Sequence, residues 1–292
     1  MPELPEVETV RRRLEPVLVG RTFEYVDIHD ARLVRPHEPA EVAAELFGER
    51  VAAVERRGKY LIVRFESGRA LLIHLRMTGG LNHDAAHGRR GSLQDDPHRR
   101  AVVRLENGSD VAYRDVRRFG TWLLLEPGEL EPYLALRVGP EPLGPGFTTA
   151  YLHGRLAGRA APLKAAVLDQ RTVAGLGNIY ADEALWRARL DPRRPAGGLS
   201  TDEVAELRRG IRAALRRGIA KQGADLGDGV YASGSMQDEF NVYGRGGEPC
   251  RRCGTIIAKT RLAGRGTSFC PTCQAASSAS SRPSRSRSRS SS

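Results

Sequence analysis

The stretch APLKAAVLDQRTVAGLGNIYADEALWRARL, residues 161–190, decides how the C-terminal half of the chain folds. The segments on both sides of the glycine-containing RTVAGLG, at 171–177, have a helical pattern. Two helices around such a turn form a helix–turn–helix-like hairpin, which is a frequent DNA-docking unit. Asn178 is expected to begin the second helix, where free backbone N–H groups attract phosphate. From the local pattern alone, an ordinary helix cap is the simpler explanation of Asn178.

Outward from this hairpin, the helical pattern covers 148–222 and includes a segment that opens with a Ser-Thr-Asp-Glu capping signature at 200–203. The preceding GPEPLGPGF, residues 139–147, is the best linker candidate, because its prolines and glycines suit neither helix nor strand.

The N-terminal half has β patterns. Residues 21–35 and 51–126 contain short strands separated by turn signals, with a hairpin turn at Asn107-Gly108. A polar, histidine-containing loop is expected to interrupt them at 79–100. Strands at this spacing indicate a sandwich or a barrel.

The chain begins MPELPEVETV, with a proline and a glutamate directly before a helix predicted over 5–19. Apolar residues recur at helical spacing along this segment, and Pro5 suits an early helical position. One face should therefore be buried and anchor the terminus. Pro2 and Glu3 lie just ahead of this helix, and taken alone the pair is best explained as incidental.

The composition favours a polyanionic partner. The 292 residues carry a formal net charge of +11 and a pI near 10.0, which points first to nucleic acid and second to an anionic membrane. The four arginines of the Arg/Ser tail at 275–292 account for only part of this charge. No apolar run approaches the ~18 residues of a membrane span, and the early charges exclude a signal peptide. We expect a soluble, intracellular protein whose low-complexity tail is either a nucleic-acid tether or a solubilising extension.

The four cysteines have the spacing of a structural zinc site: two Cys-x2-Cys pairs separated by sixteen residues. Four thiolates leave no open coordination position, so this zinc would hold a fold and take no part in chemistry. The expected ligands are Cys250, Cys253, Cys270 and Cys273. The basic segment between the pairs suits a phosphate backbone, although a solvated face explains it nearly as well. A metal site from His83, His87 and His98 is disfavoured.

Seven motifs occur in the order found in the formamidopyrimidine-DNA glycosylase and endonuclease VIII family, which the chain resembles over residues 2–274. They are MPELPEVETVRR, RRGKYLIV, HLRMTG, DVRRFG, GLGNIYADEALW, VYGRGGEPCRRCG and GTSFCPTCQ. The resemblance implies an α+β protein with an N-terminal β-sandwich, a helical domain with a helix–two-turn–helix motif, and a four-cysteine zinc finger. The expected division is 1–138 for the sandwich with its leading helix, 139–147 for the linker, 148–242 for the helical domain, 243–274 for the finger and 275–292 for a disordered tail.

The resemblance also implies an activity. Members excise oxidised bases from double-stranded DNA and cut the strand at the abasic site. The amine of Pro2, freed by removal of Met1, would attack C1′ and form a Schiff base, an electron sink for β- and δ-elimination. Glu3 would act as general acid/base. Lys59 matches a lysine that assists β-elimination, and Arg265 matches an arginine that grips phosphate and is linked to δ-elimination.

Other positions match DNA contacts of the family. His98, Arg117, Arg159, Asn178 and Tyr243 match residues that bind DNA, and Arg159 stands where a lysine is also seen. Flipping a base out of the duplex leaves a hole, and Met77, Arg117 and Phe119 match the side chains that fill it.

Leu4 and the complete set of filling residues resemble the branch that removes 8-oxoguanine and formamidopyrimidines. Two features depart from the family: Arg76 replaces a residue that is commonly glycine, and the loop at 223–240 is shortened. Three alternatives stay open: an endonuclease VIII-like preference for oxidised pyrimidines, a non-catalytic damaged-DNA-binding protein, and an RNA-binding module. We expect a cytoplasmic monomer, associated with the nucleoid when bound to DNA.

Overall fold

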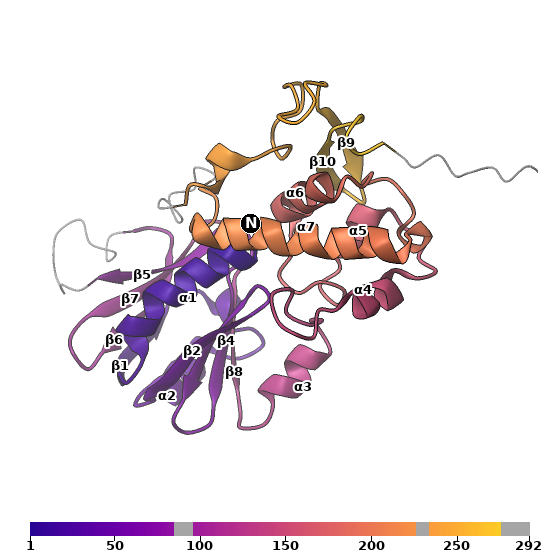
Figure 1. Ribbon diagram of the computed structural model, residues 1–292. Coiled ribbons are helices and arrows are strands. Elements are labelled where there is room, and N and C mark those ends of the chain that lie inside the picture. Colours follow the sequence, from indigo (N-terminus) through magenta and orange to yellow (C-terminus); the bar gives the residue numbers. More distant parts are fainter. Residues whose placement is uncertain (85–95, 226–233, 276–292) are drawn as a thin grey trace, which may run out of the picture.

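The computed structural model describes residues 1–84, 96–225 and 234–275 (Figure 1). His87, part of the loop expected to be shortened and nearly all of the Arg/Ser tail lie outside the described residues. Two β-sheets fill one half of the molecule, helices fill the other, and a small β-hairpin lies above the helices.

Two four-stranded antiparallel sheets form the N-terminal part, in the orders β1-β6-β7-β5 and β2-β3-β4-β8. Most of their buried apolar residues, together with one face of helix α1 (Leu4–Leu18), form one core, and the rest form a separate cluster that includes Ile62, Leu72 and Leu125. This arrangement is the sandwich expected from the sequence, and the turn at Asn107-Gly108 joins β6 to β7 as predicted. The strands are β1 Phe23–Ile28, β2 Val51–Arg57, β3 Tyr60–Phe65, β4 Ala70–His74, β5 Gly79–Asp84, β6 Arg99–Leu105, β7 Asp110–Asp115 and β8 Thr121–Leu125.

The prediction of a loop over 79–100 is wrong for its first residues, because β5 occupies Gly79–Asp84 and pairs with β7. The sequence of β5, GGLNHD, has no clear strand pattern, since β5 is an edge strand with few apolar positions. Gly79 is required here, because a Cβ would lie 2.2 Å from the hydroxyl of Tyr113. Two short helices, α2 (Pro39–Leu46) and α3 (Leu130–Ala135), were also not foreseen.

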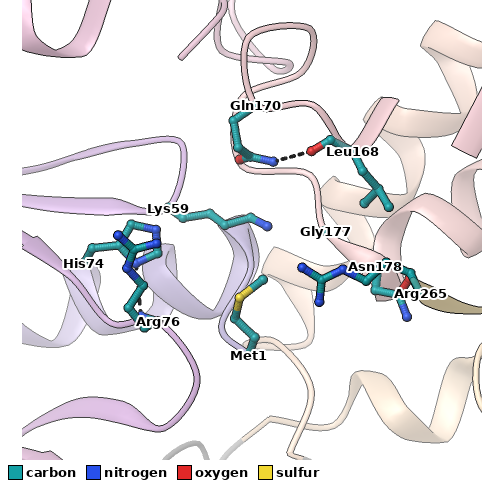
Figure 2. Close-up of a pocket in the computed structure, with 9 residues that line it drawn as sticks. All are labelled: Met1, Lys59, His74, Arg76, Leu168, Gln170, Gly177, Asn178 and Arg265. Atoms are coloured by element: carbon teal, nitrogen blue, oxygen red, sulfur yellow. Dashed lines mark hydrogen bonds between the residues drawn. The ribbon is translucent and has the colours of Figure 1, made fainter. Parts of the chain in front are cut away.

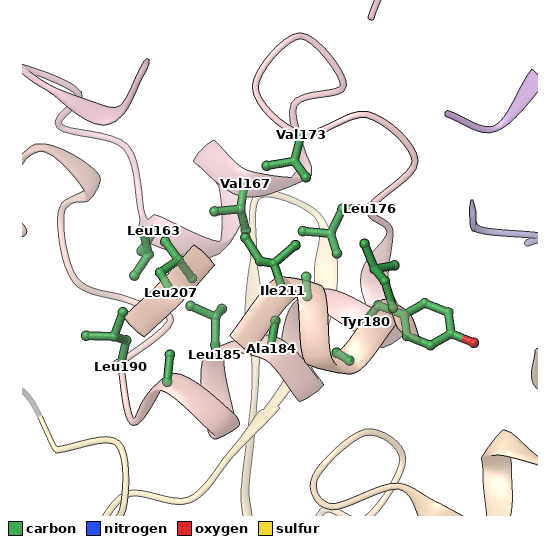
Figure 3. Close-up of a cluster of buried hydrophobic side chains, with 14 of the residues drawn as sticks. Leu163, Val167, Val173, Leu176, Tyr180, Ala184, Leu185, Leu190, Leu207 and Ile211 are labelled. Atoms are coloured by element: carbon green, nitrogen blue, oxygen red, sulfur yellow. The ribbon is translucent and has the colours of Figure 1, made fainter. Parts of the chain in front are cut away.

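The helical part forms a second core (Figure 3). Its helices are α4 Thr149–Leu156, α5 Leu163–Leu168, α6 Asn178–Ala188 and α7 Thr201–Ala220. Asn178 begins α6, as predicted. Ser200 and Glu203 form the predicted capping box of α7, because the hydroxyl of Ser200 accepts from the Glu203 N–H while the Glu203 carboxylate accepts from the Ser200 N–H.

The finger contains strands β9 (Ala258–Leu262) and β10 (Arg265–Phe269). Ala263 and Gly264 join them with φ values of 45° and 76°, which is the geometry of a tight type I′ turn. Arg265 therefore stands directly after the turn, at the first residue of β10.

Candidate functional site

A cavity of about 240 Å³ opens between the sandwich and the helical part (Figure 2). We call Lys59, His74 and Arg76 the N-terminal wall, because they come from the β2–β3 turn and the end of β4. The C-terminal wall consists of Leu168, Gln170, Gly177, Asn178 and Arg265. Met1 lies between the two walls. Among the described residues, none that lines the cavity is acidic, so the cavity suits an anion.

Glu3 joins the two walls. Its side chain, 2% exposed, accepts hydrogen bonds from the N–H groups of Ile179 (2.8 Å) and Tyr180 (3.3 Å) in the first turn of α6. Gly177 makes this approach possible, because a Cβ there would lie 2.3 Å from Cδ of Glu3. Burial raises the pKa of Glu3 by more than Lys59 and the two backbone donors lower it. The carboxyl group is thus fixed in position and shielded from water, and its protonated form is favoured.

Glu6 lies one turn further along α1 and is also buried. It accepts from the Glu3 N–H, the Tyr180 hydroxyl and the Ala224 N–H, each at 2.8 Å. Burial, and next the charge of Glu3, raise the pKa of Glu6 to about 7. The terminus is therefore held to the helical part by two carboxyl groups.

Lys59 is 6% exposed and points into the cavity from the β2–β3 turn. Burial lowers its pKa, while Glu3 and Glu6 partly oppose that shift. The turn is fixed by Glu141, whose carboxylate accepts from the Gly58 N–H at 2.5 Å and pairs with Arg56 at 2.8 Å. Lys59 is thus held close to Glu3 with a weakened preference for its charged form.

A buried ion pair supports the C-terminal wall. Lys164 on α5 and Asp182 on α6 lie 2.7 Å apart, with exposures of 0% and 1%. Lys164 Nζ also donates to the Gly266 carbonyl at 2.7 Å, and the Ser268 N–H donates to Asp182 at 3.0 Å. The amide of Asn178 donates to the same Gly266 carbonyl at 3.1 Å. The strand that carries Arg265 is therefore tied to both helices of the hairpin.

Met77, Arg117 and Phe119 lie on two neighbouring loops of the sandwich and do not line the cavity. The Phe119 ring is 53% exposed, and the Arg117 guanidinium lies 5.0 Å from its centre. Buried Asp115 ties the loops together: it accepts from the Thr78 hydroxyl at 2.5 Å and from the Arg117 N–H at 3.2 Å. Exposed Arg117 and Phe119 and half-buried Met77 are thus held on loops that Asp115 fixes in place.

The other DNA-contact candidates lie outside the cavity lining. Half-buried His98 has its backbone N–H bound to Asp96 at 2.8 Å, and Arg159 pairs with Asp169 at 3.2 Å. The backbone N–H of Tyr243 donates to buried Glu183 at 3.1 Å, and its ring packs on Phe240. The structure therefore brings Lys59, Asn178 and Arg265 together over Glu3, and the Tyr243 side chain adjoins Asn178. His98 and Arg159 stand apart.

The four cysteine sulfur atoms lie within 4.8 Å of one another. The Cys250–Cys273 and Cys253–Cys270 separations are 4.0 Å and 3.5 Å. Sulfurs at about 2.3 Å from a tetrahedral zinc are about 3.8 Å apart, so the donor set fits one structural Zn²⁺. Within the described residues, this is the only such group of potential metal ligands.

Several residues of the site were missed from the sequence. His74 and Gln170 line the cavity, and Lys164 and Asp182 support it. Burial, followed by the charges of Arg76 and Lys59, lowers the pKa of His74 to about 3, so its imidazole is neutral. The position of His74 within HLRMTG was an available signal. No comparable signal pointed to Lys164 and Asp182, which lie eighteen positions apart on segments that resemble surface helices.

A β-sandwich, a two-turn helical hairpin and a zinc finger around a cation-lined cavity define a zinc-finger protein that handles DNA. Family models match successive parts of the chain: the formamidopyrimidine-DNA glycosylase N-terminal domain at 1–122, the H2TH domain of the same enzyme at 138–228, and a zinc finger found in FPG and IleRS at 247–276. The chain belongs to the formamidopyrimidine-DNA glycosylase family.

Similar proteins agree over nearly the whole length. The formamidopyrimidine-DNA glycosylase of Symbiobacterium thermophilum is 47% identical over 279 residues, covering 94% of this chain and 89% of that protein. That of Geobacillus kaustophilus is 43% identical, covering 94% and 100%. The Lactococcus lactis Fpg in complex with abasic-site DNA is 36% identical, with a TM-score of 0.86 and coverage of 94% and 100%. A structure of the same protein with FAPY-dG DNA also has a TM-score of 0.86. In the described part of this chain, no helix is long and apolar enough to cross a membrane.

Proposed function

We propose that this chain removes oxidised purines, 8-oxoguanine and formamidopyrimidines, from double-stranded DNA and then cleaves the strand at the abasic site. Its family makes it a DNA glycosylase of base excision repair with lyase activity. The observation that carries the proposal is Glu3, a buried carboxyl at the chain terminus that is fixed by α6 beneath a cavity whose described lining is free of acidic residues.

The nucleophile in this proposal is the secondary amine of Pro2. Met1 occupies the space between the walls, so its removal would expose this amine to the cavity. Ordinary α-amino groups titrate near pH ~8, and a sizeable neutral fraction is therefore present at working pH. The amine attacks C1′, the bond to the base breaks, and the base leaves with the bonding electron pair.

Glu3 and Lys59 would handle the protons. A carboxyl with a raised pKa holds its proton more readily than an ordinary glutamate, and in its protonated form it can deliver that proton to the sugar ring oxygen as C1′ becomes an iminium carbon. A lysine with a lowered pKa loses its proton more readily than an ordinary lysine, and its neutral amine can accept the C2′ proton. Loss of that proton expels the 3′ phosphate, and a second elimination expels the 5′ phosphate.

Arg265 and Asn178 would bind the phosphates that flank the lesion, and Met77, Arg117 and Phe119 would fill the space left by the flipped base. His98, Arg159 and Tyr243 would extend the DNA contacts beyond the cavity. We place the enzyme in the cytoplasm, on the DNA that it repairs, as a monomer.

Single-turnover excision tests the substrate preference. Duplexes with 8-oxoguanine, a formamidopyrimidine, an oxidised pyrimidine or a preformed abasic site should be compared, with RNA beside them. We expect excision of the purine lesions and cleavage of the abasic site. Because the 223–240 loop is shortened, discrimination in favour of 8-oxoguanine should be weaker than in a long-loop relative. Excision of the pyrimidine alone would support the endonuclease VIII-like alternative, and binding without cleavage would support the non-catalytic one.

A further inference from the structure

Arg76 has an unusual backbone conformation for its residue type. It follows β4 with φ of +56°, in the left-handed region where a side chain is disfavoured and glycine is not. The turn is fixed around it, because the Gly79 N–H donates to the Leu75 carbonyl at 3.0 Å and the Arg76 N–H donates to His74 Nδ1 at 3.0 Å. Strain of this kind is retained mainly where the side chain has a use.

The other non-glycine residues with positive φ have structural explanations within the described chain. Arg189 is the left-handed C-cap of α6, and Gln222 follows the end of α7. Ala263 forms the β9–β10 turn. Arg118, at φ +61°, makes a two-pronged ion pair with buried Asp30 at 2.5 and 2.9 Å. For Arg76, no ion pair is found with any residue of 1–84, 96–225 or 234–275.

The guanidinium of Arg76 lies beside the His74 ring at the cavity, on the side opposite Arg265 (Figure 2). Lys59 is a third cation of the same lining. Three cationic side chains around one cavity, with no acidic residue in its described lining, repel one another, and an anion between them would remove that repulsion. The N-terminal wall thus has a charged group that the protein itself leaves without a partner among the described residues.

We propose that Arg76 binds a backbone phosphate of the lesion-containing strand, opposite the phosphate held by Arg265. The proposal rests on the proposed function, since it requires DNA in this cavity. Arg76 would be a phosphate contact on the N-terminal wall, additional to that of Arg265 on the C-terminal wall. It acts on the affinity for DNA and takes no part in the bond-breaking steps.

Arg76→Gly tests the proposal, because glycine relieves the backbone strain and removes the charge. Arg189→Gly is the matched control: it relieves the same strain at an exposed helix end away from the cavity. Both variants should unfold at the same or higher temperature than the parent. Binding to a duplex with a tetrahydrofuran abasic analogue should weaken roughly five- to tenfold for Arg76→Gly only. The slope of log K against log salt should become shallower by about 0.9, as for one lost phosphate contact.

Cleavage of a true abasic site by Arg76→Gly should need more DNA for half-maximal rate, by the same roughly five- to tenfold factor as the loss of affinity, whereas Arg189→Gly should not. Unchanged affinity and salt slope in a folded Arg76→Gly protein would overturn the proposal, and so would an altered lesion preference with an unchanged slope, which would indicate a base contact. Arg76→Asn, which also tolerates positive φ, replaces Arg76→Gly if that variant fails to fold. Absence of abasic-site cleavage by the parent protein would instead contradict the proposed function.

Discussion

Arg265 and Arg76 face each other across the cavity but are supported in different ways. On the C-terminal wall, the strand of Arg265 is tied to the buried Lys164–Asp182 pair and to Asn178. On the N-terminal wall, Arg76 stands on a turn with an unfavourable backbone angle and has no ion-pair partner among the described residues. One wall is therefore stabilised from inside the protein, whereas the other keeps a cation that no described residue pairs with and that is available to a ligand.

Between the walls, Glu3 and Glu6 connect α1 to the helical part. Both are buried acids, which are costly unless each oxygen finds a donor. The backbone N–H groups of α6 and of Ala224 supply those donors. The chain terminus is thus positioned by donors that lower the pKa of these two carboxyls, although burial raises it by more.

The largest expected effect comes from breaking the support of the C-terminal wall. Lys164→Met leaves Asp182 buried without its partner, which should lower the free energy of unfolding by about 3–5 kcal/mol. Thermal or denaturant unfolding measures this loss. At temperatures where the variant is folded, δ-elimination should fall relative to β-elimination, because the β9–β10 hairpin that carries Arg265 loses its support.

The double variant Lys164→Met/Asp182→Leu separates charge from packing. It should recover most of the stability, since replacing both members of a buried pair is often neutral. If Lys164→Met is as stable as the parent and gives the same ratio of products, the ion pair does not support this wall.

A smaller effect is expected at the junction of the walls. Gly177→Ala places a Cβ where Glu3 Cδ is 2.3 Å away, so the carboxyl must leave its two backbone donors. We expect a loss of about 1–3 kcal/mol together with a large loss of excision. Gly154→Ala in α4 is the control, because a Cβ there meets nothing within 4 Å and should add up to about 1 kcal/mol. Equal excision by the two variants would show that the position of Glu3 is not critical.

The smallest effect, counted per pH unit, is a pH dependence of stability. Glu6 has an ordinary pKa of 4.5 when unfolded and about 7 in the fold, so the native state binds more protons between these values. The free energy of unfolding should therefore fall as pH rises from about 4.5 to 7, by at most about 1.4 kcal/mol per pH unit from this group. Glu3, which faces Glu6, shifts in the same direction.

Glu6→Gln should show a flatter profile over this window. Its overall stability is a poorer measure, because the amide cannot replace the acceptor that Glu6 Oε2 offers to the Glu3 N–H. The slopes should therefore be compared by denaturant unfolding at several pH values. Identical slopes for parent and variant would mean that Glu6 does not titrate in this range.

Local sequence patterns predicted much of this molecule. The Asn107-Gly108 turn, the capping box of Ser200 and the cysteine spacing each depend on neighbouring residues. The supports of the site do not, because Glu3 meets Ile179 across 176 positions and Lys164 meets Gly266 across 102. A lysine in a helical segment is usually exposed, so only the fold reveals that Lys164 is buried. Likewise, the need for glycine at 177 arises from Glu3, which is remote in sequence.

The central claim is that the terminal amine of Pro2 is the nucleophile held over Glu3. Borohydride added during reaction with DNA containing 8-oxoguanine reduces a Schiff base to a stable bond. Peptide mapping of the trapped complex should find DNA attached to Pro2, and trapping should be greatly reduced in Pro2→Gly and in protein that keeps Met1. Efficient trapping through an internal lysine such as Lys59, with the terminus blocked, would contradict the account.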